Sequence, residues 1–279
     1  AEGEGVYGFF TGRKGHLLAE VVVRARADRL WLELPPGKDA EISEHLGKYL
    51  VSDRVEVVSL EATLPLTLLG PEAPDRLQDL TGAQELPGPP WRHAELELLG
   101  CEVLVSADGR WGVAAYSLWV PAAEASALVD QLLASGGPVP VGYQAADLLR
   151  LEEGIAWYGR DFGPANLPQE TGIEGAIDYE KGCYLGQEVV ARLHFRGQVS
   201  RMLRPLGFES DEPPPPGTPL IYEGREAGRV TSAVRSPAKG RVVGIGLLQR
   251  RAMEPGTRLQ VEGGGEVVVR ALAGETSGA

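Results

Sequence analysis

The chain has 279 residues, of which 43% are hydrophobic and 24% charged, as expected of a globular protein with more than one lobe. Its net charge of −12 at pH 7 argues against direct binding of nucleic-acid backbones. No apolar run approaches the roughly 20 residues needed to span a bilayer, which argues against a membrane protein. The first residues lack the basic and apolar parts of a signal peptide, so we expect a cytoplasmic protein.

The first third of the chain predicts mixed α and β structure. Apolar runs at Leu17–Val23 and Arg29–Leu34 flank Ala25–Asp28, which is typical of a hairpin. Helical spacing of apolar residues predicts a helix over Asp39–Tyr49. The next candidates, two strands and a short helix, are Val55–Ser59, Thr63–Leu69 and Pro74–Leu80.

A second series of strands followed by a helix comes next. Its strand candidates are Trp91–Leu99, Glu102–Ser106 and Trp111–Val120. Pro121 then precedes a predicted helix over Ala122–Ala134, which Gly and Pro residues end. The recurring order predicts two α+β units of similar plan.

A predicted helix over Tyr143–Glu152 leads into a loop-rich stretch, residues 154–182. Loops longer than about 15 residues inside a compact domain are usually functional or disordered. Trp157, Tyr158 and Phe162 argue against disorder, so we expect this loop to pack against the fold.

The tail after Arg204 consists of short β-prone runs separated by Gly and Pro. They are Leu220–Tyr222, Gly228–Val234, Arg241–Leu248, Thr257–Val261 and Glu266–Ala271. Strands of this length and spacing predict a small all-β barrel or sandwich. We therefore place a domain boundary near residue 205.

The two cysteines do not form a disulfide framework, which favours a reducing compartment. Cys101 lies in an apolar run and is predicted to be structural. Cys183 precedes a predicted helix start at Gly186 and follows Lys181, so the helix dipole and the ammonium would favour its thiolate. A buried cysteine in a glycine turn is the alternative, and the local sequence leaves both open.

Metal sites have little support in the sequence. An iron–sulfur cluster takes about four protein ligands, mostly cysteine, so we expect no complete cluster on this chain. A cluster could still be shared at an interface through Cys183. The scattered histidines show no H-E-x-x-H spacing, and phosphate-loop, dinucleotide and hydrolase motifs are missing from the sequence.

A basic patch interrupts the acidic chain. Its members are Arg192, His194, Arg196, Arg201 and Arg204. Guanidinium groups suit a carboxylate or phosphate ligand, whereas a solvated face with ordinary ion pairs is the alternative. Composition adds a separate hint: Asn166 is the only asparagine and prolines number 21, which fits a thermophile, although a GC-rich genome gives a similar bias.

The segment Lys181–Glu188 reads K-G-C-Y-L-G-Q-E, and its surroundings carry further motifs. Leu149–Asp161 contains R-x-E-x-G-x-x-x-x-G-x-D, Leu167-Pro168-x-Glu170 gives L-P-x-E, and Gly228–Ser232 gives G-x-V-T-S. In these motifs the chain resembles YgfZ-type proteins, a branch of the glycine-cleavage T-protein (aminomethyltransferase) superfamily. The resemblance runs over nearly the whole chain.

The resemblance implies an α+β fold of three lobes around a central channel. Two ferredoxin-like lobes, approximately 1–48 with 142–204 and 49–141, would form a folate-binding part over 1–204. A C-terminal β-barrel would occupy 205–279. We expect a monomer.

The resemblance also implies a tetrahydrofolate-linked accessory factor in iron–sulfur protein assembly or repair, with effects on tRNA modification. Its partners would be folate and iron–sulfur client or assembly proteins. The residues implied in catalysis are Cys183, Lys181 and Glu188. Those implied in folate binding are Tyr184, Gln187, Arg192, Arg196 and Glu170.

Two departures from the aminomethyltransferase pattern leave an enzymatic role open. The Y-x-G-E-x-G segment that holds the pterin corresponds to Arg110–Tyr116, where Val113 replaces the acid. The G-G-x-x-D-D segment corresponds to residues 14–20, where only Glu20 is acidic. The chain also begins close to this segment, so either the usual start is reduced or the sequence is incomplete. The alternative functions are a one-carbon transferase using tetrahydrofolate, with Glu20 as base, and a scaffold that binds folate as a signal.

Overall fold

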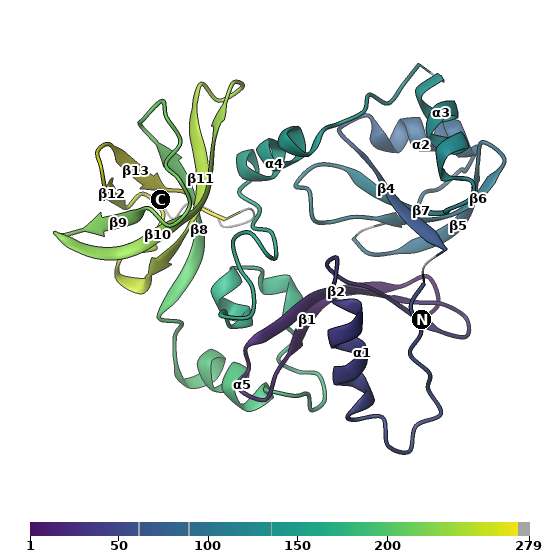
Figure 1. Ribbon diagram of the computed structural model, residues 1–279, viewed down its shortest axis with the longest axis horizontal. Coiled ribbons are helices and arrows are strands. Elements are labelled where there is room, and N and C mark those ends of the chain that lie inside the picture. Colours follow the sequence, from purple (N-terminus) through teal and green to yellow (C-terminus); the bar gives the residue numbers. More distant parts are fainter. Residues whose placement is uncertain (61, 89, 135, 273–279) are drawn as a thin grey trace. The chain divides into compact units, whose positions relative to one another are not determined.

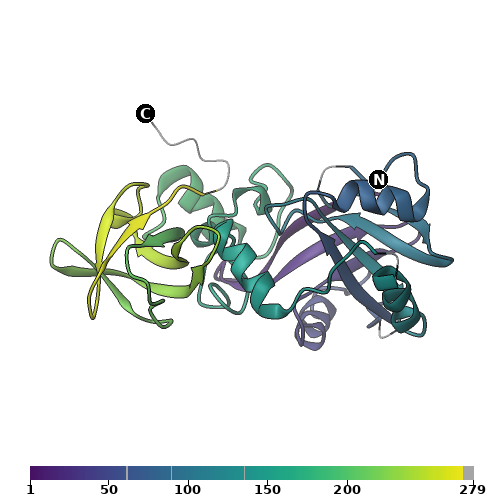
Figure 2. The same ribbon diagram turned by 90° about the horizontal axis from the view of Figure 1, so that it is seen from above.

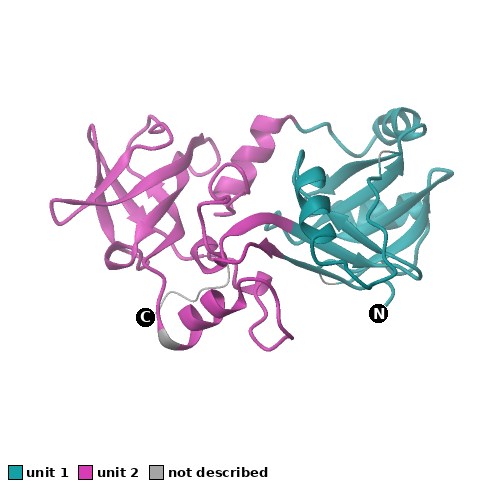
Figure 3. Ribbon diagram, turned by 60° about the horizontal axis from the view of Figure 1, so that its bottom comes forward, with its two compact units in different colours: residues 1–8, 21–141 teal, residues 9–20, 142–279 magenta. Residues whose placement is uncertain are grey.

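The computed structural model describes all residues except 61, 89, 135 and 273–279. The chain forms two compact units, residues 1–8 with 21–141 and residues 9–20 with 142–279 (Figure 3). Strands β1 (Gly5–Thr11) and β2 (Leu17–Ala25) contribute residues to both units. Within the described part of the chain, no helix is long and apolar enough to cross a bilayer.

Unit 1 contains an antiparallel sheet in the order β4-β7-β6-β5. Its strands are β4 (Thr63–Leu69), β5 (His93–Leu98), β6 (Cys101–Ala107) and β7 (Ala115–Pro121). Helices α2 (Ala73–Thr81) and α3 (Ala125–Ala134) cover one face, where Leu77 and Leu128 join the apolar sheet residues in one core (Figure 1, Figure 2). In β6 and β7, residues of both faces are buried, because the helices cover one face and the second sheet lies against the other.

The second sheet has the order β1-β2-β3, with β3 at Leu30–Glu33. Helix α1 (Asp39–Gly47) lies on the side of this sheet away from β4–β7 and buries Ile42 (Figure 1). The other side faces the first sheet, where Arg24 Nε donates to Ser106 Oγ at 3.1 Å. The interface between the two sheets of unit 1 is therefore partly polar.

Unit 2 contains helix α4 (Tyr143–Glu152), the 3₁₀ turns Pro168–Thr171 and Glu174–Ala176, helix α5 (Gln187–Arg196) and a closed barrel. The barrel order is β10-β11-β8-β13-β12-β9, and every pairing is antiparallel. Its strands are β8 (Arg201–Phe208), β9 (Pro219–Tyr222), β10 (Arg225–Ser236), β11 (Arg241–Gln249), β12 (Arg258–Val261) and β13 (Glu266–Val269). A short 3₁₀ turn, Arg250–Ala252, follows β11.

The barrel encloses its own core. Inward-facing residues of alternating strand positions, including Phe208, Leu220, Val230 and Val242, are almost completely buried. A second core, with Leu17, Leu151, Phe162 and Ile245 among its members, joins the start of β2, α4 and the predicted loop to the barrel strands. The expectation that the aromatic loop packs into the fold is confirmed by buried Phe162.

The predicted α+β class with a C-terminal β-barrel is confirmed, as are the early hairpin and the helix over Tyr143–Glu152. The strand predicted at Val55–Ser59 is wrong: these residues form no strand, and the side chains of Val55 and Val58 are mostly exposed. A β-prone run becomes a strand only where a neighbouring edge accepts its backbone hydrogen bonds.

Two strands were not predicted. Glycines interrupt the apolar pattern of β1, and β8 contains Arg and Pro among its apolar residues. Because β8 pairs with β11 and β13, the barrel begins at Arg201, and the predicted boundary near 205 falls inside this strand. The three-lobe arrangement and the proposed ranges of its lobes stay predictions.

Candidate functional site

The segment Lys181–Glu188, which the sequence singled out, forms a turn that leads into helix α5. Gly186 precedes the first helical residue with φ 84°. The backbone N–H of Tyr184 donates to Gln187 Oε1 at 3.3 Å, which ties the turn to the first helical residue. The predicted helix start after Gly186 is confirmed.

This turn packs tightly against the connection between β1 and β2. A Cβ added to Gly186 would lie 2.5 Å from the carbonyl oxygen of Gly12 and 2.8 Å from the Cα of Gly15. Thr11 Oγ1 donates to the carbonyl oxygen of Leu185 at 2.5 Å. Only glycine fits at Gly186, for reasons of both space and backbone conformation.

Cys183 lies in the exposed part of the turn, so the buried alternative is excluded. The ammonium of Lys181 is placed 4.9 Å from the ring centre of Tyr184, where it makes a cation–π contact. Gly182 has a negative φ, and no atom lies within 4 Å of a Cβ built on it. Among the described residues, nothing would clash with a side chain at position 182.

Aromatic rings extend this surface onto α5. The rings of Tyr179 and His194 stack with centroids 3.6 Å apart, and His194 meets exposed Phe195 edge to face. Burial raises the pKa of Tyr184, and the nearby Tyr179 and Asp178 raise it further. The raised pKa values keep Tyr179 and Tyr184 protonated, and Tyr184 directly follows Cys183 in the sequence.

Glu188 and Arg192 are exposed on α5, with Glu188 in its first turn. Arg196 ends the helix, and its side chain lies outside the described part of the structure. Arg201 and Arg204 do not belong to an exposed basic patch with the others. Arg201 Nε donates to Glu170, and Arg204 is buried. The basic residues whose side chains the structure describes therefore do not form one shared anion site.

Glu170, predicted to bind folate, is buried, and both of its carboxylate oxygens accept hydrogen bonds from other residues of the chain. Its Oε2 accepts from Asn166 Nδ2 at 3.0 Å and from the Leu167 backbone N–H at 3.3 Å. Its Oε1 accepts from Arg201 Nε at 3.0 Å. These bonds favour a structural role, so folate binding by Glu170 stays a prediction without a free oxygen to support it.

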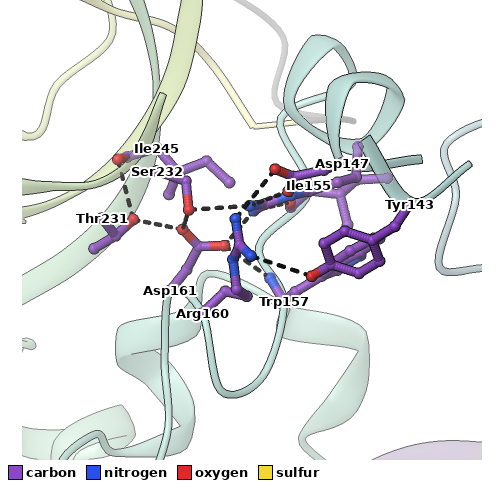
Figure 4. A network of polar contacts seen from close by, with 10 residues as sticks. Tyr143, Asp147, Ile155, Trp157, Arg160, Asp161, Thr231, Ser232 and Ile245 are labelled. Carbon is purple, nitrogen blue, oxygen red and sulfur yellow. Dashed lines mark hydrogen bonds and ion pairs between the residues drawn. The ribbon is translucent and has the colours of Figure 1, made fainter. Parts of the chain in front are cut away.

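A buried ion pair that the sequence interpretation did not single out lies in unit 2 (Figure 4). Arg150 Nη1 pairs with Asp161 Oδ2, and both side chains are fully buried. Arg150 also donates from Nε to Asp147 Oδ1 at 2.8 Å and from Nη2 to Ser232 Oγ at 3.0 Å. Asp161 Oδ1 accepts from Thr231 Oγ1 at 2.6 Å and from Ser232 Oγ at 2.7 Å.

This network explains two of the sequence motifs together. The first and last residues of R-x-E-x-G-x-x-x-x-G-x-D are Arg150 and Asp161, and the last two of G-x-V-T-S are Thr231 and Ser232. The network joins α4 and the loop after it to strand β10 of the barrel. The available signal in the sequence was Asp161 in the aromatic loop, together with Arg150 in the helix before that loop.

A second polar network lies between the sheets of unit 1. Arg110 pairs with Glu33 Oε1 at 2.6 Å and with Asp108 Oδ2 at 2.7 Å. Burial opposes the charge of Arg110, but its hydrogen bonds and ion pairs outweigh that effect and raise its pKa. Arg24, which pairs with Glu33 Oε2 at 2.9 Å, has its pKa lowered, chiefly by burial. Val113 lies in the same turn as Arg110.

Cys101 is buried in the core of unit 1, as predicted, and burial raises the pKa of its thiol to about 11. Among the residues that the structure describes, no group of three or more His, Cys, Asp or Glu side chains is placed to hold a metal ion.

The fold defines an α+β protein with a C-terminal six-stranded antiparallel barrel. The family profile described as "GCVT N-terminal domain" matches residues 1–181, and the one described as "Glycine cleavage T-protein C-terminal barrel domain" matches residues 203–273. The chain therefore belongs to the glycine-cleavage T-protein (aminomethyltransferase) superfamily.

Individual relatives agree with this assignment. The chain is 34% identical over 218 residues to an aminomethyltransferase of Moorella thermoacetica, covering 77% of this chain and 59% of that protein. It is 30% identical over 253 residues to the dimethylsulfoniopropionate demethylase DmdA of Ruegeria pomeroyi, covering 90% and 68%. The fold is similar to the crystal structure of glycine cleavage system aminomethyltransferase T from Bartonella henselae, with TM-score 0.85, 24% identity, and coverage of 98% and 76%.

Proposed function

We propose that this protein is a tetrahydrofolate-dependent one-carbon-transfer protein. The observation that carries the proposal is the match to both T-protein domains, together with relatives named as an aminomethyltransferase and a demethylase. These comparisons favour the one-carbon alternative over the iron–sulfur reading that the hallmark motif first implied. Bound tetrahydrofolate would supply the nitrogen atoms that carry the one-carbon unit.

Glu20 is the acid that this chain offers for proton transfer in such a reaction. It lies in β2, half-buried. A partly buried carboxylate can act as a general base when a substrate nitrogen lies within hydrogen-bond reach. Tyr184, Gln187, Arg192 and Arg196 remain our candidates for folate contacts, with the arginines suited to the acidic folate tail.

The test is a titration with tetrahydrofolate followed by turnover of an aminomethylated carrier protein. We expect binding at micromolar concentrations and formation of methylenetetrahydrofolate, with turnover reduced at least a hundredfold in Glu20→Gln, in line with the usual contribution of a general base. Glu97→Gln, at an exposed position in strand β5, is the matched control for loss of a carboxylate. Failure to bind at high micromolar levels would remove folate from the proposed function.

A second candidate is the YgfZ-type role in iron–sulfur protein assembly or repair, with secondary effects on tRNA modification. The exposure of Cys183 in its K-G-C-Y-L-G-Q-E segment supports this candidate. An exposed thiol can bind metal or exchange with a partner's cysteine, which a buried thiol such as Cys101 cannot do.

Complementation separates the two candidates. In cells that lack this protein, Cys183→Ala should fail to restore the activity of iron–sulfur enzymes, while exposed Ser200→Ala should restore it. Carrier turnover in vitro should be unaffected by Cys183→Ala if the thiol serves only the maturation role. Full restoration by Cys183→Ala would end the second candidate and leave the first intact.

A further inference from the structure

Two arginines of unit 2 extend over the same glycine on the outer face of the barrel. Arg241 begins β11, and Arg270 directly follows β13, the two strands that flank β8. Gly207 of β8 pairs with Val243 on one side and with Val268 on the other. Because side chains alternate along a strand, Arg241 and Arg270, each two residues from these partners, share the face of Gly207. That face points away from the barrel core, which contains the alternate residues of the three strands.

Gly207 leaves the space that both side chains use. A Cβ built on Gly207 would lie 3.5 Å from Arg270 Cδ and 3.8 Å from Arg241 Nη1. Arg270 lies level with Pro205, whose carbonyl oxygen accepts from its backbone N–H at 2.8 Å. Arg241 precedes Val243, the partner of Gly207, and so lies on the other side of the glycine along β8. The two arginines therefore approach Gly207 from opposite directions.

Neither guanidinium is neutralised within the described part of the chain. No hydrogen bond or ion pair joins the side chain of Arg241 or Arg270 to another described residue. Arg270 Nη1 is also shielded from solvent, so this donor is buried without an acceptor among these residues. Burial lowers the pKa of Arg270, the charge of Arg241 lowers it further, and Glu153 raises it. Glu153 therefore attracts Arg270 without forming an ion pair with it.

The acids that share the outer face are paired with a different arginine. Glu209 lies two residues beyond Gly207 on β8, and its Oε1 is 2.8 Å from Arg258 Nη1. Glu266 of β13 lies 3.1 Å from the same nitrogen. Neither carboxylate forms an ion pair with Arg241 among the described residues.

The buried donor and the two like charges lack an acceptor. Nearly all buried polar atoms in native proteins are hydrogen-bonded, and like charges close together repel each other unless an anion lies between them. We propose that Arg241 and Arg270 bind a phosphate group, as inorganic phosphate or as a small phosphate monoester. A tetrahedral phosphate presents oxygens to guanidinium groups on two sides, whereas the two oxygens of a carboxylate match a single fork. Arg241 is exposed, so the ligand can enter from solvent.

Calorimetry on the full chain tests the site, with inorganic phosphate, glycerol phosphate and acetate as probes at equal ionic strength. We expect saturable binding of at least one of the two phosphates, and weaker binding of acetate. Arg241→Met and Arg270→Met should each lower phosphate affinity at least about tenfold, because each removes a charged donor. Exposed Arg225→Met, at the start of β10, is the matched control for loss of one positive charge and should bind like wild type.

Gly207→Asp gives a second test that does not remove either arginine. Gly207 has no positive φ, so a side chain is compatible with its backbone, and the new carboxylate would lie between the two guanidinium groups. We expect a higher melting temperature than in Gly207→Asn, which has nearly the same size without the charge. Phosphate should raise the melting temperature of wild type, since it binds the folded state, but not that of Gly207→Asp.

Melting curves of each variant separate loss of binding from loss of fold. Wild-type phosphate affinity in folded Arg241→Met and Arg270→Met would overturn the proposal, as would the lack of saturable binding up to about 10 mM of either phosphate. Acetate binding as tight as phosphate binding would also overturn it and indicate a carboxylate site. The site contains none of the residues proposed for folate binding or proton transfer, so each of these results leaves the proposed function to its own test.

Discussion

At the scale of single residues, the pair of Arg150 and Asp161 is buried and joined to several further hydrogen-bond partners in unit 2. Both oxygens of Asp161 accept hydrogen bonds, and Arg150 donates to two loop or helix acceptors besides its ion partner. A buried ion pair contributes little over an apolar pair of similar size, but removal of Asp161 would leave Arg150 with Asp147 as its one charged partner among the described residues. The pair therefore acts mainly to specify how α4 meets the barrel.

Asp161→Asn should destabilise the protein by about 1–3 kcal/mol, because the hydrogen bonds to the Asp161 carboxylate are weakened and Arg150 keeps only Asp147 as a charged partner. Arg160→Ala should cost less than about 1 kcal/mol, since its ion pair to Asp147 is largely solvent-exposed on the arginine side. Urea denaturation followed by tryptophan fluorescence measures both. Equal effects of the two substitutions would show that burial of the pair does not matter.

The carboxylate of Asp108 predicts an acid-dependent contribution to stability. Burial would raise its pKa, but hydrogen bonds and charge from Arg110 and a hydrogen bond from Ser117 outweigh burial, so the pKa lies below its ordinary 3.8. A lowered folded-state pKa stabilises the protein above the unfolded value, and that stability is lost as pH falls through the folded value.

The stability difference between wild type and Asp108→Asn should therefore be constant from neutral pH to about pH 5 and shrink below about pH 4. Denaturation midpoints measured across this range test the prediction. Exposed Asp130→Asn is the control and should shift the midpoint by the same small amount at every pH. A difference that grows toward low pH would reverse the assigned sign.

At the scale of elements, the structure distinguishes two glycines of the same motif. Gly186 has φ 84° and no space for a Cβ, because the backbone of the β1–β2 connection lies against it. Gly182 has open space and an ordinary backbone. Gly186 therefore serves the fold, whereas Gly182 leaves open space next to Cys183 in the sequence.

Gly186→Ala should therefore lower stability by at least about 1–2 kcal/mol, from the cost of a left-handed residue with a Cβ. Gly182→Ala should stay within about 0.5 kcal/mol of wild type, as expected for an exposed surface change. Thermal and urea unfolding compare the two. If Gly182→Ala is stable yet fails in the complementation assay, space beside the thiol is part of its function.

The elements also show which parts of the fold the sequence could predict. The early hairpin and α4 follow from local apolar patterns and turn residues, which act over a few positions. Strand β8 could not be recognised in this way, because its arginines were read as a basic patch. In the structure Arg201 pairs with Glu170 and Arg204 is buried, so both serve the fold. Conversely, Val55–Ser59 has the composition of a strand, but no strand of the described structure pairs with it.

At the scale of the whole molecule, the site residues divide by how far apart they lie in sequence. The turn around Cys183 is formed by neighbouring residues, so the sequence motif predicted the helix start after the turn. Only the exposure of the Cys183 thiol was left open. In unit 1, Arg24 and Glu33 come from one sheet, and Trp119, whose ring lies 5.5 Å from Arg24 Cζ, comes from the other. No local pattern could predict this contact, because it forms only where the two sheets face each other.

The two polar networks lie in different compact units, which leads to a prediction about the whole chain. Every contact described for Asp161 belongs to unit 2, and every contact described for Asp108 belongs to unit 1. Local opening depends on the contacts within a cooperative segment. Asp161→Asn should therefore increase hydrogen exchange in α4 and β10, and Asp108→Asn should increase it in β3, β6 and β7.

Hydrogen exchange followed by mass spectrometry of peptides can resolve these segments. The double variant should show the sum of the two patterns, since mutations without shared partners are usually additive. Strands β1 and β2 are the informative region, because their residues belong to both units. Exchange that rises equally in all segments after either substitution would mean that the chain opens as one cooperative body, and that the two networks stabilise a common fold.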